Sequence, residues 1–220
     1  MPRVRVKICG ITRIADALAA ANSGADAIGL IFHDPAPRNV PLDTAVRIVT
    51  TLPPFVTPVG VFVNASIDTI RKTCTQLRIR HIQLNGSDTP ETVAELADFT
   101  VIKSIKVTPT GFEQTLSTWR EKISSLTLTN LHAFVLETPG PAPGGSGQSN
   151  DWDHVLAAQR IGAFDGLPPI IAAGGLNPEN VAQVVSWIKP YAVDVSSGVE
   201  ESLSRKSPDK IRAFIRAATS

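Results

Sequence analysis

The chain has 220 residues, enough for one large domain with a full hydrophobic core, and its 21 basic and 20 acidic side chains leave a formal net charge of +1. That balance argues against a nucleic-acid surface or an anionic-membrane surface, and no apolar stretch reaches the roughly 18 residues of a membrane span. Two cysteines outside any CxxC or histidine-rich cluster exclude a disulfide framework and make a metal site unexpected, so we expect a cytoplasmic protein.

Strand-like and helix-like segments alternate eight times along the chain. The predicted strands are Val4–Cys9, Ala25–Phe32, Val56–Val63, Arg80–Leu84, Thr100–Val107, His132–Glu137, Pro169–Ala173 and Tyr191–Val195. The predicted helices are Arg13–Ser23, Leu42–Thr51, Ile67–Gln76, Pro90–Ala97, Gly111–Leu126, Trp152–Ala163, Pro178–Ile188 and Pro208–Ala218. Strands that are apolar on both faces, each followed by a helix, indicate a parallel sheet covered by helices.

Three of these helices begin with a recognisable cap. Ser66 and Ser207 precede their helices as N-cap residues, and Asn177 precedes Pro178 in the same way. A serine or asparagine side chain at this position accepts a hydrogen bond from a free backbone N–H, and proline is favoured in the first helical turn.

Eight strand–helix units favour a single-domain (β/α)8 TIM barrel spanning residues 1–220 over a doubly wound open sheet. An open sheet needs only five or six strands and carries its glycine loop after the first strand. Here the glycine loops come late, after the sixth, seventh and eighth strands, where barrels build phosphate sites. The Pro-, Gly- and Ser-rich segment 139–150 reads as an active-site loop.

These late loops predict a phosphorylated small-molecule ligand. Glycine lets backbone amides approach a phosphate closely, and serine hydroxyls add donors. A single loop of this kind could be only a tight turn, but three after adjacent strands favour the binding site. The candidate phosphate-binding residues are Gly145, Ser146, Gly147, Gly174, Gly175, Ser196, Ser197 and Gly198.

Two strand ends carry candidate acid/base groups. Cys9 ends the first strand and Glu137 ends the sixth, so a thiol and a carboxyl face each other across the barrel mouth. Such a pair can move protons near a carbonyl or an imine. The alternative interpretations are a small buried hydrophobic residue for Cys9 and a solvated or lysine-paired rim charge for Glu137.

Other polar residues near strand ends are candidates for binding the substrate. Arg38 follows the second strand in a proline-stiffened loop and suits carboxylate recognition, unless it simply faces solvent. Lys7 and Lys103 could lower the pKa of the thiol, pair with a substrate anion, or be structural. Gln83 and Asp194 could face the mouth or the upper core, and no histidine shows metal-ligand spacing.

Several segments, taken in chain order, carry a family resemblance: Val6–Thr12, Pro37–Arg38, Val59–Asn64, Gln83–Gly86, Gly144–Gly147, Ala173–Val181 and Asp194–Glu200. Together they resemble the phosphoribosylanthranilate isomerase family of tryptophan biosynthesis. Members of that family are (β/α)8 barrels that need no cofactor and convert N-(5-phosphoribosyl)anthranilate to 1-(2-carboxyphenylamino)-1-deoxyribulose 5-phosphate. They occur as monomers or as dimers.

The resemblance implies a role for each matched site residue. Cys9 would be the general base at the C2′ proton, and residue 137 the acid at the furanose ring oxygen. Arg38 would hold the anthranilate carboxylate. The loops at 145–147, 175 and 197–198 would bind the phosphate of the substrate.

The chain departs from the family pattern at three places. Glu137 stands where the family has aspartate, which moves the carboxyl by roughly one ångström and can cost about a hundredfold in rate unless the strand end is repositioned. Asn85 stands where the family usually has histidine. The family's Gly-x-Lys-Asp sequence has no clear match here, where residues 203–209 take its place.

These departures leave two alternatives open. One is a related barrel acting on another phosphorylated aminoaldose, and the other is a sugar-phosphate binder without turnover. A pure binder needs neither Cys9 nor a carboxyl at 137, so both residues disfavour it. A bifunctional histidine/tryptophan isomerase is also disfavoured, because such a barrel carries a carboxylate where Cys9 stands and has a duplicated phosphate loop.

Overall fold

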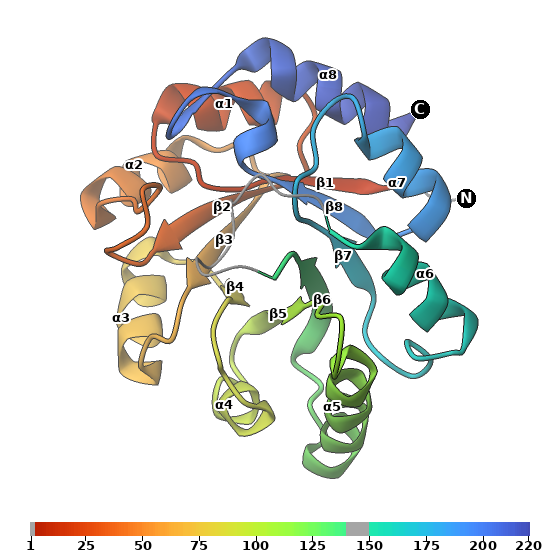
Figure 1. Ribbon diagram of the computed structural model, residues 1–220. Helices are drawn as coiled ribbons and strands as arrows, with labels where there is room; N and C mark the ends of the chain where they lie inside the picture. Colours follow the sequence, from red (N-terminus) through yellow and green to blue (C-terminus); the bar gives the residue numbers. More distant parts are fainter. Residues whose placement is uncertain (1–2, 140–149) are drawn as a thin grey trace.

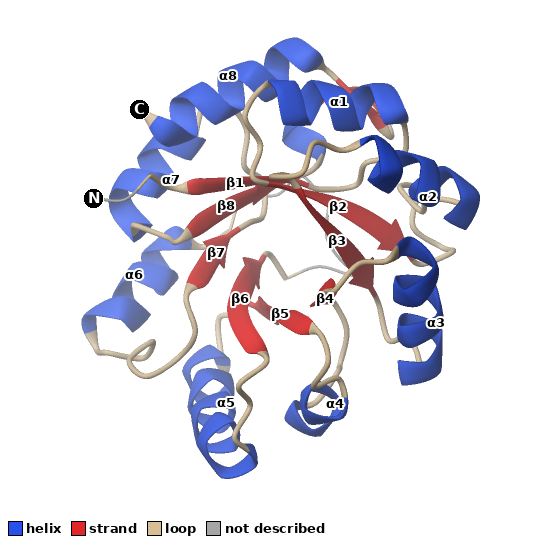
Figure 2. Cartoon of the chain, turned by 180° about the vertical axis from the view of Figure 1, so that it is seen from behind, coloured by secondary structure: helices blue, strands red, loops and turns tan. Residues whose placement is uncertain are grey.

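The computed structural model describes residues 3–139 and 150–220, and its strands close into a parallel barrel in the order β1 to β8, with β1 paired to β8. The helices lie outside the ring of strands (Figures 1 and 2). This confirms the (β/α)8 barrel expected from the alternating pattern. None of the helices in the described ranges has the length and apolar character needed to cross a membrane.

The element bounds follow the expected ones closely. The strands are β1 Arg5–Ile8, β2 Ala27–Phe32, β3 Thr57–Phe62, β4 His81–Leu84, β5 Thr100–Lys106, β6 Leu131–Glu137, β7 Ile170–Ala172 and β8 Ala192–Val195. The helices are α1 Ile14–Asn22, α2 Leu42–Thr51, α3 Ile67–Leu77, α4 Pro90–Glu95, α5 Phe112–Leu126, α6 Trp152–Arg160, α7 Val181–Ile188 and α8 Pro208–Thr219.

Alternate residues of β6 pack into two different cores. Phe134 belongs to the large cluster between the sheet and the helices, where it meets Trp119 of α5 at a ring-centroid distance of 5.5 Å. Ala133 and Val135 belong to a smaller cluster with residues of β7 and β8. Successive side chains of a strand point to opposite faces, so Glu137 shares the face of Ala133 and Val135. The strand period thus directs Glu137 into the barrel.

The helix caps at Ser66 and Ser207 are confirmed, but the predicted start of the seventh helix is wrong. Ser66 accepts from the backbone N–H of Thr69, and Ser207 accepts from that of Lys210. By contrast, α7 begins at Val181 rather than at residue 178. The Asn177 side chain accepts from the N–H groups of residues 179 and 180 and so stabilises a turn ahead of the helix.

A short structure after β8 is not foreseen by the alternating pattern. A 3-10 turn, η1 (Ser197–Val199), leads into an antiparallel hairpin of β9 (Glu200–Ser202) and β10 (Arg205–Lys206). Its strands are too short to show a recognisable period in the sequence. The hairpin matters for the site because it carries Glu200 and Lys206 toward the barrel mouth.

Candidate active site

A cavity opens at the carboxyl ends of the strands, and most of the predicted site residues line it. Parallel barrels keep their reactive groups at this end, because the loops that follow the strands meet there. The wall includes the candidate base and acid, the loop arginine and the described glycine and serine loops: Cys9, Arg38, Gln83, Glu137, Gly174, Gly175, Ser196 and Ser197. The predicted phosphate residues Gly145, Ser146 and Gly147 lie outside the described residues.

Cys9 stands just beyond the end of β1 and is buried. Its backbone N–H donates to the carbonyl oxygen of Val195 over 2.8 Å, which continues the pairing of β1 with β8. Burial raises the pKa of the thiol above its ordinary value, and Asp194 raises it further, while Lys7 and Lys206 oppose the shift. The thiolate is therefore a minority species that gains its stability from neighbouring cations.

Lys7 supplies one of those cations from inside the barrel. Its Nζ donates to Asp194 Oδ1 over 2.9 Å, and both side chains are buried. Burial alone would lower the pKa of Lys7, but Asp194 and Cys9 raise it above its ordinary value. The contact with Cys9 supports the expectation that Lys7 lowers the pKa of the thiol, whereas its predicted contact with substrate stays a prediction.

Replacing Lys7 by methionine should slow chemical modification of Cys9. The change removes the cation that lowers the pKa of the thiol most, so that pKa rises and less thiolate is present at a given pH. The measurement is the rate of iodoacetamide alkylation against pH in a Cys74→Ala background. An alkylation profile that stays at the wild-type pH would contradict the assigned role of Lys7.

Glu137 is the last residue of β6 and is 8% exposed. Burial raises the pKa of its carboxyl, and hydrogen bonds from Ser104 and Asn85 partly offset that rise. The Asn85 bond joins Nδ2 to Glu137 Oε1 over 2.7 Å. A carboxyl with a raised pKa keeps its proton closer to neutral pH, as a general acid requires.

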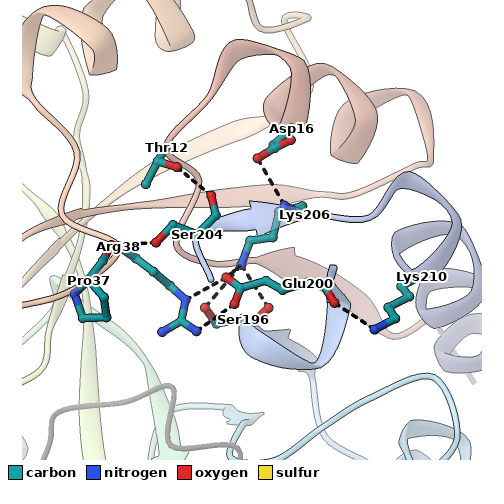
Figure 3. A network of polar contacts seen from close by, with 9 residues as sticks. All are labelled: Thr12, Asp16, Pro37, Arg38, Ser196, Glu200, Ser204, Lys206 and Lys210. Carbon is teal, nitrogen blue, oxygen red and sulfur yellow. Dashed lines mark hydrogen bonds and ion pairs between the residues drawn. The ribbon is translucent and has the colours of Figure 1, made fainter. Parts of the chain in front are cut away.

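Arg38 is fixed at the cavity wall by a buried carboxylate. Its Nε and Nη2 donate to the two oxygens of Glu200 over 2.7 and 2.8 Å, and Lys206 Nζ donates to Glu200 over 2.9 Å (Figure 3). Lys206 also donates to the Ser196 carbonyl over 2.9 Å. The hairpin thus ties the loop after β2 to the loop after β8, and the bidentate pair restricts the guanidinium to one orientation.

The sequence reasoning missed Glu200, which holds Arg38 at the cavity wall, and Lys206, which donates to Glu200. The resemblance includes Glu200 within a matched segment but assigns it no role, and Lys206 lies in residues 203–209, which do not match the family sequence clearly. The signal available in the sequence was a carboxylate and a lysine following the last glycine loop. Arg38, which pairs with Glu200, is 162 positions away from it in the sequence, so only the closure of the barrel reveals the contact.

The loops after β7 and β8 approach their neighbours too closely for any side chain other than that of glycine. Gly174 has a φ of +94°, and a Cβ there would lie 2.2 Å from Thr138 Oγ1. A Cβ on Gly198 would lie 1.9 Å from the Leu176 carbonyl oxygen. Glycine at these positions therefore packs the loops after β6, β7 and β8 against one another, which is the arrangement expected of a phosphate cradle.

Comparisons with known proteins agree with this geometry. Residues 6–217 match the family model of N-(5'-phosphoribosyl)anthranilate isomerase. The chain belongs to this family. Among its relatives, the N-(5'-phosphoribosyl)anthranilate isomerase of Citrifermentans bemidjiense is 41% identical over 215 residues, which are 97% of this chain and 96% of that one.

Solved structures of the isomerase family share the fold. The phosphoribosyl anthranilate isomerase of Thermotoga maritima superposes with a TM-score of 0.85 and 38% identity over 98% of each chain. A second structure, with a TM-score of 0.81 and 35% identity over 98% of each chain, is in complex with reduced 1-(o-carboxyphenylamino)-1-deoxyribulose 5-phosphate. These matches confirm the family that the sequence motifs indicate.

The structure brings together two of the positions at which this isomerase departs from the family pattern. Glu137 and Asn85 are 52 residues apart in sequence, yet their side chains form a direct hydrogen bond. Asn85 also lines the cavity. The two departures are therefore one local feature of the site.

Proposed function

We propose that this isomerase catalyses the Amadori rearrangement of N-(5-phosphoribosyl)anthranilate, with Glu137 as the general acid and Cys9 as the general base. The observation that carries the proposal is that both groups line one cavity with Arg38 and the described glycine loops. A carboxyl with a raised pKa and a thiol beside a buried lysine have the acid and base properties that the reaction needs.

The reaction needs one proton delivered and one removed. Glu137 gives its proton to the furanose ring oxygen as the C1′–O bond breaks, and the nitrogen lone pair forms the C1′=N bond of a protonated Schiff base. The Cys9 thiolate then takes the C2′ proton, and the electrons of the C2′–H bond form the enaminol. Tautomerisation of the enaminol gives the aminoketose. Cys9 then loses its proton to solvent and Glu137 takes one back, so a full turnover makes no net change in protons or electrons.

The remaining wall residues would orient the substrate. Arg38 suits the anthranilate carboxylate because Glu200 already fixes its guanidinium at the wall. The buried Gln83 Oε1 has no hydrogen-bond partner among the described residues, so it can accept one from the substrate. The phosphate would lie on the loops at Gly174–Gly175 and Ser196–Gly198, with residues 145–147 as further candidates.

Steady-state turnover of freshly generated phosphoribosylanthranilate tests the function directly. The wild-type chain should remove the anthranilate-type fluorescence of the substrate with saturation kinetics. Absence of turnover by folded protein that still binds inorganic phosphate would favour another phosphorylated aminoaldose as substrate. We place the enzyme in the cytoplasm as a monomer or a homodimer, and sedimentation velocity will distinguish these two assemblies.

Replacing Arg38 by lysine should weaken substrate binding more than it slows the chemical step. Lysine keeps the charge but loses the planar fork, so KM should rise about 10- to 100-fold while kcat changes much less. The matched control is Arg205→Lys, because Arg205 lies on the hairpin that carries Glu200 but has an exposed side chain paired to Glu201. A fall in kcat with unchanged KM would place Arg38 in the chemistry instead.

A further inference from the structure

A line of hydrogen bonds runs from the barrel wall through Asn85 to Glu137. Gln83 of β4 is buried, and its Nε2 donates to Asn85 Oδ1 over 2.7 Å. Asn85 Nδ2 donates to Glu137 Oε1, also over 2.7 Å. Because Gln83 engages the amide oxygen of Asn85, the amide nitrogen faces the carboxyl. Gln83 therefore determines which end of the Asn85 amide meets Glu137.

The backbone of residue 85 is held on both sides. Its own N–H donates to the Phe62 carbonyl over 2.8 Å. The buried Lys103 Nζ donates to the carbonyls of Leu84 over 3.2 Å and Gly86 over 2.7 Å, the two residues that flank position 85. A side chain whose backbone and amide are both fixed needs little reorganisation to act on its neighbour.

We propose that Asn85 is a positioning residue for Glu137, whose hydrogen bond to the carboxyl strengthens as that group gives up its proton. This inference rests on the proposed function, in which Glu137 protonates the ring oxygen. A hydrogen bond to a carboxylate is about twice as strong as one to a neutral group. Asn85 thus stabilises the state that proton transfer produces more than the state before it, which lowers the barrier.

The other charged groups around Glu137 come from three strands. Asp194 of β8 raises the pKa of Glu137 and Lys7 of β1 lowers it, in addition to burial and the bonds from Ser104 and Asn85. Lys103 of β5, whose pKa burial lowers to about 8, is also close enough to interact with Glu137. A substitution at 85 leaves these groups in place, so its effect on Glu137 is separable from theirs.

The pH dependence of kcat/KM reports the ionisation of Glu137. The reactive form combines protonated Glu137 with the Cys9 thiolate. Below the pKa of Glu137 the rate rises with pH as thiolate forms, and above that pKa the gain in thiolate is offset by the loss of protonated Glu137. The acidic break in the profile therefore reports the pKa of Glu137. The substrate phosphate, with a pKa of about 6, titrates in the same way with every variant, so a shift of the break between variants comes from the protein.

Three substitutions at position 85 test the proposal. Asn85→Leu removes the donor, so the acidic break should move to higher pH and kcat should fall about tenfold or more with little change in KM. Asn85→Asp places a second carboxyl against the first and should move the break further. Asn85→His keeps an N–H donor at this position and should leave the break near its wild-type pH.

A buried asparagine elsewhere provides the matched control. Asn130 donates to the carbonyls of Val93 and Leu96 over 2.9 and 3.0 Å, and Asn130→Leu should lower the thermal midpoint without moving the acidic break. If Asn85→Leu does not fold, the contrast between the other two variants still decides, because the break should move to higher pH in Asn85→Asp and stay near its wild-type pH in Asn85→His. An acidic break that stays at the wild-type pH in Asn85→Asp overturns the proposal.

A direct titration separates failure of this proposal from failure of the proposed function. The infrared band of the protonated Glu137 carboxyl, identified by its absence in Glu137→Gln, gives the pKa of this group without any turnover. If the wild-type chain turns over no substrate, the proposed function fails, yet the band still shows whether Asn85 controls the carboxyl. A band that titrates at the same pH in wild type and Asn85→Leu rules out that control.

Discussion

Cys9→Ala should lose turnover almost completely while retaining affinity for the substrate. The thiolate is the only group assigned to take the C2′ proton, and general-base catalysis typically contributes about 10²- to 10⁴-fold in rate. Alanine occupies less space than cysteine at a position where a Cβ on Gly29 would lie 2.6 Å from the sulfur, so the substitution relieves contact instead of adding it. We expect kcat to fall by at least about a hundredfold, measured by fluorescence loss.

A binding measurement on Cys9→Ala and a control substitution at the second cysteine complete this experiment. The affinity of Cys9→Ala for reduced 1-(o-carboxyphenylamino)-1-deoxyribulose 5-phosphate, measured by calorimetry, should stay near that of the wild type. Cys74→Ala is the matched control, because Cys74 is buried on α3 and burial raises its pKa to about 12. It should cost stability but leave kcat unchanged. A Cys9→Ala variant that keeps most of its turnover would exclude the thiol as the base.

The strand-end residues could be predicted from the sequence because one geometric rule places them. Cys9 and Glu137 each stand at the end of an apolar strand, where a loop or helix begins. The parallel strands of a barrel bring such ends together at one mouth. The period of two then directs Glu137 inward with Ala133 and Val135. Local pattern and topology agree at these positions, so the fold and the placement of these two side chains at the mouth could be predicted without knowledge of tertiary contacts.

The contacts that orient those groups could not be predicted in the same way. The pair between Arg38 and Glu200 joins the loop after β2 to the hairpin after β8, and these two segments approach only when β1 closes the barrel between β2 and β8. Position 85 is a partial exception, because Gln83 and Asn85 are two residues apart and their proximity follows from the strand period. What the sequence did not show is that the Asn85 amide reaches Glu137, which depends on side-chain orientation in the folded barrel.

Glu137→Gln should remove the acid while keeping the shape of the side chain. Glutamine can accept and donate hydrogen bonds but has no proton to give at any accessible pH, so kcat/KM at neutral pH should fall by about 10²- to 10⁴-fold. The buried position and the bond from Asn85 remain available to the amide oxygen of glutamine. The measurement is the full pH profile of kcat/KM for the variant beside that of the wild type.

The form of that profile tests the assignment more sharply than the loss of rate. Burial raises the pKa of both groups, but from a much lower starting value in the carboxyl than in the thiol. In the proposed mechanism the wild type therefore reacts through a minority form, with Glu137 protonated and Cys9 ionised. In Glu137→Gln only the thiolate requirement remains. The residual kcat/KM of Glu137→Gln should therefore keep rising with pH beyond the pH at which the wild-type profile levels off. A variant that is slow but keeps the wild-type acidic break would show that another group supplies the proton and that Glu137 only shapes the cavity.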